Sequence, residues 1–146
     1  MLKETLLEDL KSAMKEKDTV TKNTIQMARA AILQVEKDKQ ITLEDNDILT
    51  ILAKEVKKRK DSLVDYEKGG REDLVEQIKK EIQVLEKYLP KPLSREELEK
   101  EIKQIVQEQN ATSMKDMGKV MKVAKEKIGT RADGKEINEI VKSLLQ

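Results

Sequence analysis

Apolar residues recur at intervals of three and four along most of this chain, and that spacing limits what it can fold into. The clearest stripe consists of Leu74, Ile78, Ile82, Leu85 and Leu89. This spacing gathers apolar side chains on one face of an α-helix, whereas a half-buried strand needs alternation at every second residue. Strand signals are absent from the sequence. The sequence therefore predicts an all-α fold.

Glycine and proline are rare, and they mark the ends of the expected helices. A first helix is expected over about residues 3–17, a second over about 20–39, and a third from an N-cap at Thr42 to about residue 68. Gly69 and Gly70 should end the third helix, because glycine accepts the left-handed conformation without steric cost. A fourth helix should then begin near Arg71 and carry the clearest apolar stripe.

Pro90 and Pro92 form the best domain boundary, because each lacks an amide hydrogen and disfavours the helical state of the preceding residue. Beyond them, Ser94, Ser113 and Asp133 are expected to cap three shorter helices. We therefore predict two domains. Residues 1–89 should form a four-helix unit with long paired third and fourth helices, and residues 93–146 a C-terminal three-helix bundle.

The composition excludes several classes of function. The chain has neither Cys nor His, which removes thiol catalysis, thiolate metal sites and the usual general base near neutral pH. It also has no Trp or Phe, so base stacking on aromatic platforms is nearly excluded. We expect no catalytic residue, cofactor or metal site. A Ser–Lys arrangement stays open as the minor enzymatic alternative.

The N-terminal residues are acidic and amphipathic and contain no long apolar core. A signal peptide and a membrane span are therefore not expected. We predict a cytoplasmic protein without a membrane partner.

The stretch 115–135 carries most of the functional signal. It holds seven Lys and Arg residues against three Asp and Glu, a local excess of four in a chain whose net charge is +1. A helix here would place Lys115, Lys119 and Lys122 opposite its apolar residues. Such a face suits a polyanion, although a solvated face in a Lys-rich protein is the simpler alternative. The RNA-binding candidates are Lys115, Lys119, Lys122, Lys125, Arg131 and Lys135.

Arg59 and Gly118 favour structural interpretations. Arg59 lies near the apolar stripe of the third helix, so its stem should cover apolar surface while its guanidinium group pairs with a carboxylate. Gly118 stands inside a helical run, where it costs about 1 kcal/mol relative to Ala. We expect it to admit a neighbouring helix, with close approach of a phosphate backbone as the alternative.

Three blocks of sequence, in this order and spacing, are similar to a known family. The first joins residues 57–62 to 69–74, the second joins 85–90 to Leu93 and Ser94, and the third joins 116–121 to 132–135. Together they resemble the YqeY family, whose members are similar to the C-terminal tail of the GatB component of the tRNA-dependent amidotransferase. The chain departs from the family pattern at Gln26, Pro92, Lys122, Val123 and Ala124.

This resemblance implies an all-helical fold of two units and a link to the amidotransferase, in which the matching tail grips the folded body of tRNA. It also carries a label of carbon–nitrogen ligase activity with glutamine as the amido donor. The Ser-Ser-Lys amidase and the kinase-like body of that enzyme have no counterpart in these residues. The label is therefore a weak guide to this chain.

Three hypotheses follow. The leading one is a non-catalytic helical module that docks on tRNA or another structured RNA through phosphate contacts and shape. The second is a protein-interaction module for an amidotransferase or synthetase complex, or for a second copy of the chain. The third is the glutamine-dependent enzyme.

Overall fold

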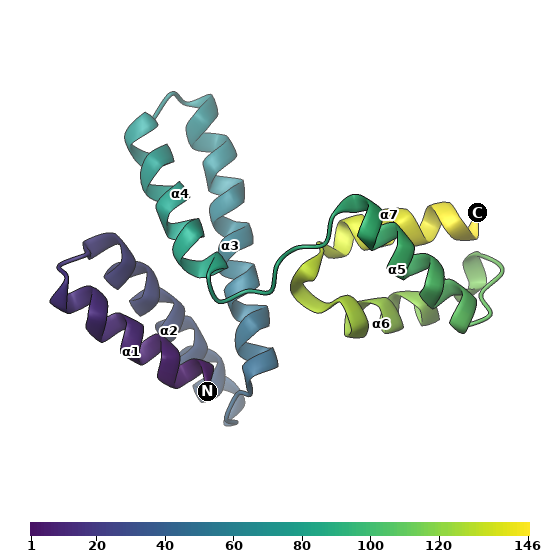
Figure 1. Cartoon of the computed structure of the whole chain (residues 1–146), viewed down its shortest axis with the longest axis horizontal. Coiled ribbons are helices and arrows are strands. Elements are labelled where there is room, and N and C mark those ends of the chain that lie inside the picture. The colour runs from purple at the N-terminus through teal and green to yellow at the C-terminus, as the bar shows by residue number, and fades with distance from the viewer. The chain divides into compact units, whose positions relative to one another are not determined.

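The computed structural model describes all residues, 1–146, and contains helices and no strands (Figure 1). This confirms the all-α prediction. Two short 3₁₀ turns, η1 and η2, flank α6. The elements are α1 (Leu2–Lys15), α2 (Thr19–Lys39), α3 (Asp45–Lys68), α4 (Glu72–Glu86), α5 (Arg95–Glu108), η1 (Met114–Asp116), α6 (Met117–Ile128), η2 (Gly129–Arg131) and α7 (Gly134–Leu145).

The helices fall into two compact units, Met1–Leu89 (unit 1) and Pro90–Gln146 (unit 2). In unit 1, α4 packs against the second half of α3, and α1 runs antiparallel beside α2 (Figure 1). Unit 2 packs α5, α6 and α7 against one another. Whether the two units fold as independent domains stays a prediction.

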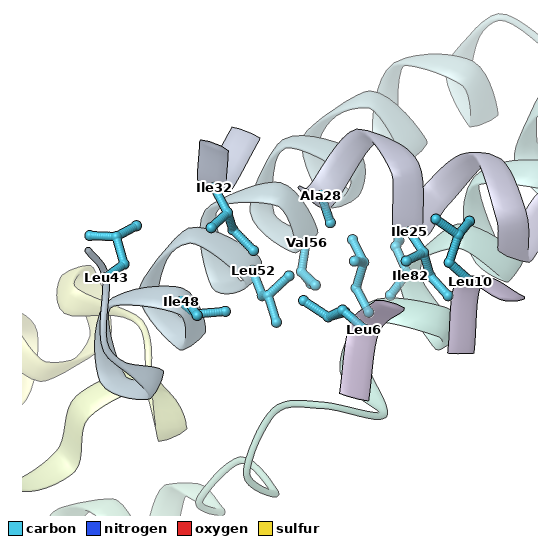
Figure 2. Close-up of a cluster of buried hydrophobic side chains, with 11 residues drawn as sticks. Leu6, Leu10, Ile25, Ala28, Ile32, Leu43, Ile48, Leu52, Val56 and Ile82 are labelled. Carbon is cyan, nitrogen blue, oxygen red and sulfur yellow. The ribbon is translucent and has the colours of Figure 1, made fainter. Parts of the chain in front are cut away.

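The core of unit 1 draws on all four helices, as the close-up in Figure 2 shows. Burying one such Leu or Ile side chain contributes about 1.5–3 kcal/mol relative to leaving it in water. The buried residues of the unit 1 core are Leu6, Leu10, Ile25, Ala28, Ile32, Leu43, Ile48, Leu52, Val56, Ile82 and Leu85. The core of unit 2 consists of Leu98, Ile102, Ile105, Val120, Ala124, Ile128, Ile137, Ile140, Val141 and Leu145.

The predicted N-cap of α3 is wrong. The helix begins at Asp45 with Glu44 as its N-cap, and the Glu44 amide donates to Asp47 Oδ2 at 3.2 Å. Thr42 lies outside the helix because its neighbour Leu43 is bound to a residue of α2. Leu43 is buried, and its amide donates to Glu36 Oε2 at 2.8 Å. That contact with α2 keeps the chain non-helical until residue 44.

The other helix ends follow the local signals more closely. Gly70 has φ +70° and takes the left-handed conformation that ends α3. Ser94 Oγ accepts a hydrogen bond from the Glu97 amide at 3.2 Å, and Asp133 Oδ1 accepts one from the Lys135 amide at 3.2 Å. The predicted caps of α5 and α7 are therefore confirmed.

The predicted cap of α6 is wrong. The Ser113 side chain makes no capping bond, and the residues after it form the 3₁₀ turn η1 before α6 begins at Met117. Asp116 accounts for the difference, because its Oδ2 accepts a hydrogen bond from the Thr112 amide at 3.0 Å. This bond ties Asp116 to the residues before the turn and not to α6.

A stretch of apolar residues long enough to cross a membrane is found in none of the helices.

Candidate nucleic-acid interface

The six predicted RNA-binding residues all lie in unit 2, on consecutive elements. Lys115 belongs to η1, and Lys119, Lys122 and Lys125 belong to α6. We call these four lysines the α6 basic face, and all four are exposed. The buried residues Val120, Ala124 and Ile128 fix the opposite side of α6 against the core. Because of this anchoring, Lys119 and Lys122 point toward solvent.

The α6 basic face is only lightly neutralised. Lys115, Lys122 and Lys125 form no salt bridge within 4.0 Å, and Lys119 Nζ donates to the backbone carbonyl of Gln109 at 3.2 Å. A backbone carbonyl carries no net charge, so Lys119 keeps its full charge toward solvent. The exposed carboxylate of Glu126, one helical turn after Lys122, is the first of two acidic groups that reduce the positive charge near this face.

Asp116 is the second carboxylate near this face, and it is already engaged. The hydrogen bond from the Thr112 amide, followed by one from Ser113 and the charge of Lys119, lowers the pKa of Asp116. Asp116 is therefore ionised at neutral pH. The four lysines together outweigh Asp116 and Glu126 by two charges.

Lys127 and Arg131 are paired with groups of unit 2, unlike the lysines of the α6 basic face. Lys127 Nζ lies 2.7 Å from Glu108 Oε2 on α5. Arg131 donates to the carbonyls of Lys127 at 2.9 Å and Ile128 at 3.2 Å, and its Nη2 lies 3.4 Å from Glu101 Oε2. Arg131 thus caps the end of α6 and ties it to α5. Its contact with RNA stays a prediction.

Lys135 lies in the first turn of α7, and its side chain is exposed. It forms no salt bridge within 4.0 Å. Since Asp133 caps the same turn, Lys135 stands next to a carboxylate that stabilises the helix start. Lys135 is therefore a further unpaired cation, but it lies on α7 and is not part of the α6 basic face.

Gly118 lies on the exposed side of α6, contrary to the expected close approach of a helix. A Cβ atom built at this position would meet no atom within 4 Å. The space above Gly118 is open, next to Lys119. The prediction that Gly118 admits a neighbouring helix is wrong, because α5 and α7 pack against the opposite side of α6, where Val120, Ala124 and Ile128 are buried.

Unit 1 contains a groove of about 690 Å³ between the end of α1, the start of α2 and α4. Its lining includes the carboxylates of Asp9, Glu16 and Asp18 and the cations Lys80 and Lys87. Burial and a hydrogen bond to Asp9 raise the pKa of Tyr88, so its hydroxyl stays protonated and donates to Asp9. No group of three His, Cys, Asp or Glu side chains is placed to hold a metal ion.

Sequence reasoning missed the carboxylates that neutralise part of the basic segment. Glu108 and Glu101 lie on α5, 19 and 30 residues from the cations that they contact. Nothing in the local sequence marks such distant pairs. These carboxylates pair with two of the seven cations of residues 115–135, Lys127 and Arg131, and leave the others without a carboxylate from α5.

The chain matches the family model described as YqeY-like protein over residues 3–145. It belongs to the YqeY-like protein family. A relative from Kluyveromyces lactis, named altered inheritance of mitochondria protein 41, mitochondrial, is 39% identical over 109 residues, which cover 69% of this chain and 56% of the relative. A protein of the same name from Candida glabrata is 38% identical over 88 residues, covering 58% of this chain and 48% of the relative.

An uncharacterized protein from Schizosaccharomyces pombe is 30% identical over 94 residues, which cover 64% of this chain and 73% of that protein. The chain spans about half the length of the relatives named for mitochondrial inheritance. Those names describe inheritance and location and mention no ligand or reaction. The family membership therefore establishes a YqeY-like helical domain, and the function must be argued from the surface of this chain.

Proposed function

We propose that this protein is a non-catalytic helical module that docks on tRNA or another structured RNA through the α6 basic face. The observation that carries the proposal is the state of its four lysines. All four are exposed, three form no salt bridge, and the fourth binds only a backbone carbonyl. Free ammonium groups on a rigid helix attract phosphates and release the counterions that surround them.

The rest of the surface favours contacts to the RNA backbone over reading of bases. The two aromatic residues are Tyr66 and Tyr88, both in unit 1, and Tyr88 is committed to Asp9. Unit 2 therefore has no aromatic ring on which a base could stack. A helix that presents lysines at fixed spacing recognises the shape of a folded RNA through its phosphates.

The test is a matched pair of charge reversals in the intact chain. The K119E/K122E variant reverses the centre of the α6 basic face. The K100E/K103E variant makes the same change in net charge on two exposed lysines of α5. Binding of a fluorescent, folded tRNA transcript is measured at constant salt for both variants and the wild type.

We expect K119E/K122E to weaken binding by about tenfold or more, and K100E/K103E to weaken it much less, because only the first pair would lie near phosphates. Equal weakening by both variants would show that net charge, and not this face, controls binding. No effect of K119E/K122E would remove the α6 basic face as the contact surface.

The location of the protein is a separate proposal. We propose the cytoplasm, whereas the fungal relatives carry the word mitochondrial in their names. Fractionation of cells that produce the untagged chain tests this. Recovery in an organelle fraction would contradict the proposal.

A further inference from the structure

The outer side of the α1–α2 hairpin combines exposed apolar side chains with unpaired cations. Leu7 and Met14 of α1 are 36% and 55% exposed, and Leu33 of α2 is 56% exposed. Lys22 and Arg29 of α2 are half-buried, and at 100° per residue both lie within about 40° of Leu33 around the helix. We call these five residues the α1–α2 seam.

The geometry of the hairpin brings the two halves of this seam together. α1 and α2 run antiparallel (Figure 1). The ion pair between Lys3 and Glu36 shows their register, because it places residue 3 of α1 beside residue 36 of α2. With 100° per residue, Leu7 lies on the same flank of α1 as Lys3, and Leu33 on the same flank of α2 as Glu36. The two leucines therefore lie along the line where the helices meet, on the side away from the core.

Charge along α2 is unusual for this chain. Residues 19–35 contain two cations and no Asp or Glu, whereas 40% of all residues are charged. The two cations are Lys22 and Arg29, and neither forms a salt bridge within 4.0 Å. Partial burial of a charge without a partner costs free energy that an ion pair would offset. The Glu36 carboxylate on this flank is already paired with Lys3, so Lys22 and Arg29 lack a partner that a bound protein could supply.

We propose that the α1–α2 seam docks an acidic amphipathic helix of a partner protein. The apolar face of that helix would cover Leu7, Met14 and Leu33, and its Asp and Glu residues would pair with Lys22 and Arg29. In such recognition of an amphipathic helix, apolar anchors supply affinity and complementary charge supplies orientation. An RNA backbone offers phosphates to the cations but nothing apolar to cover three aliphatic side chains.

Site-specific photocrosslinking in the full-length chain tests this proposal. A photoreactive amino acid replaces Leu33 in cells that naturally produce the protein. A control chain carries it at Val64, which is 49% exposed on α3 of the same unit. Crosslinked segments are identified by mass spectrometry, and a synthetic peptide of the captured segment is then titrated against the purified chain.

We expect position 33, and not position 64, to capture one protein through a segment that has apolar residues at helical spacing and Asp or Glu on its flanks. Adding K22E/R29E to the crosslinking chain should remove most of this product, whereas K100E/K103E should leave it intact. The same reversals should weaken binding of the synthetic peptide by about tenfold or more.

Four outcomes would overturn the proposal: equal capture at positions 33 and 64, capture of RNA, capture of a second copy of this chain, or capture of a segment without carboxylates. The result is separable from the RNA proposal because the two surfaces lie on different units. K22E/R29E should leave tRNA binding unchanged, and K119E/K122E should leave the crosslink at position 33 unchanged. Circular dichroism of each variant confirms that its helices are retained.

Discussion

Arg59 of unit 1 and Lys122 of unit 2 are both cations on helices rich in lysine, yet their surroundings are opposite. Arg59 is 6% exposed, its Nη1 lies 3.0 Å from Glu55 Oε2, and its Nε lies 3.1 Å from Glu81 Oε1. Lys122 is exposed and forms no salt bridge within 4.0 Å. Arg59 therefore stabilises the pairing of α3 with α4, and Lys122 remains available to a ligand. The number of cations in a segment therefore does not show how many of them are free to bind a ligand.

The largest expected effect comes from breaking the Arg59 cluster. Replacing Arg59 with Met leaves Glu55 and Glu81 facing each other in a largely buried setting, and removing one partner of a buried pair costs about 3–5 kcal/mol. Urea denaturation followed by circular dichroism measures the loss in unit 1.

The triple variant R59M/E55Q/E81Q serves as the control, because it leaves no uncompensated charge. It should be more stable than R59M alone. A cost below about 1 kcal/mol for R59M, in the range of exposed ion pairs, would contradict a structural role for Arg59.

Arg131 sharpens the comparison, because it was a candidate for RNA contact and is held by the protein itself. Replacing Arg131 with Ala removes two bonds to the last carbonyls of α6 and the contact with Glu101. We expect a loss of about 1–2 kcal/mol in the stability of unit 2, since hydrogen bonds from charged groups are among the stronger ones. Thermal unfolding measures this loss of stability. Unchanged stability would show that Arg131 has no structural role and is available to a ligand.

A smaller effect should follow from converting a held cation into a free one. Replacing Glu108 with Gln removes the carboxylate that pairs with Lys127, so Lys127 could join the phosphate contacts. The slope of log affinity against log salt for tRNA should then steepen by about 0.9.

The matched control for E108Q is E139Q, which makes the same change in net charge on the exposed surface of α7. It should leave the slope unchanged. An equal steepening by both variants would mean that overall charge, and not release of Lys127, is responsible.

The smallest expected effect is a dependence of stability on acid pH. Hydrogen bonds from Lys3 and from the Leu43 amide lower the pKa of Glu36 below its ordinary value of 4.5. This stabilisation is complete above 4.5, and it is lost as the pH falls below 4.5 through the lower folded value, because the unfolded chain takes up its proton first. Melting temperatures between pH 6 and pH 3 should fall less steeply for E36Q than for the wild type. Parallel curves would contradict this.

Local signals determined most of the fold, and contacts between distant residues determined the rest. Gly70, Ser94 and Asp133 act within a few residues, and their roles could be predicted from the sequence. Thr42 looks like an equally good cap, but the bond between Glu36 and the Leu43 amide places the start of α3 further along the chain. Neither residue carries a local sign of that contact.

For the candidate site too, the sequence predicted the features that depend on the local helix and missed those that depend on packing. Helical periodicity predicted that Lys119 and Lys122 lie opposite the apolar side of α6, because the period depends only on the local helix. It could not predict that Arg131 is tied to Glu101, since these residues meet only when α5 packs against the end of α6. The side-chain partners of charged residues are a property of packing, and here they separate the structural cations from the free ones.

The most direct test of the RNA-binding account is the number of ions released when the intact protein binds folded tRNA. Four phosphate contacts predict a slope of log affinity against log salt of about −3.6 for the wild type, and a slope near zero when all four lysines of the α6 basic face are replaced by Ala. The same slope in both proteins would contradict the account.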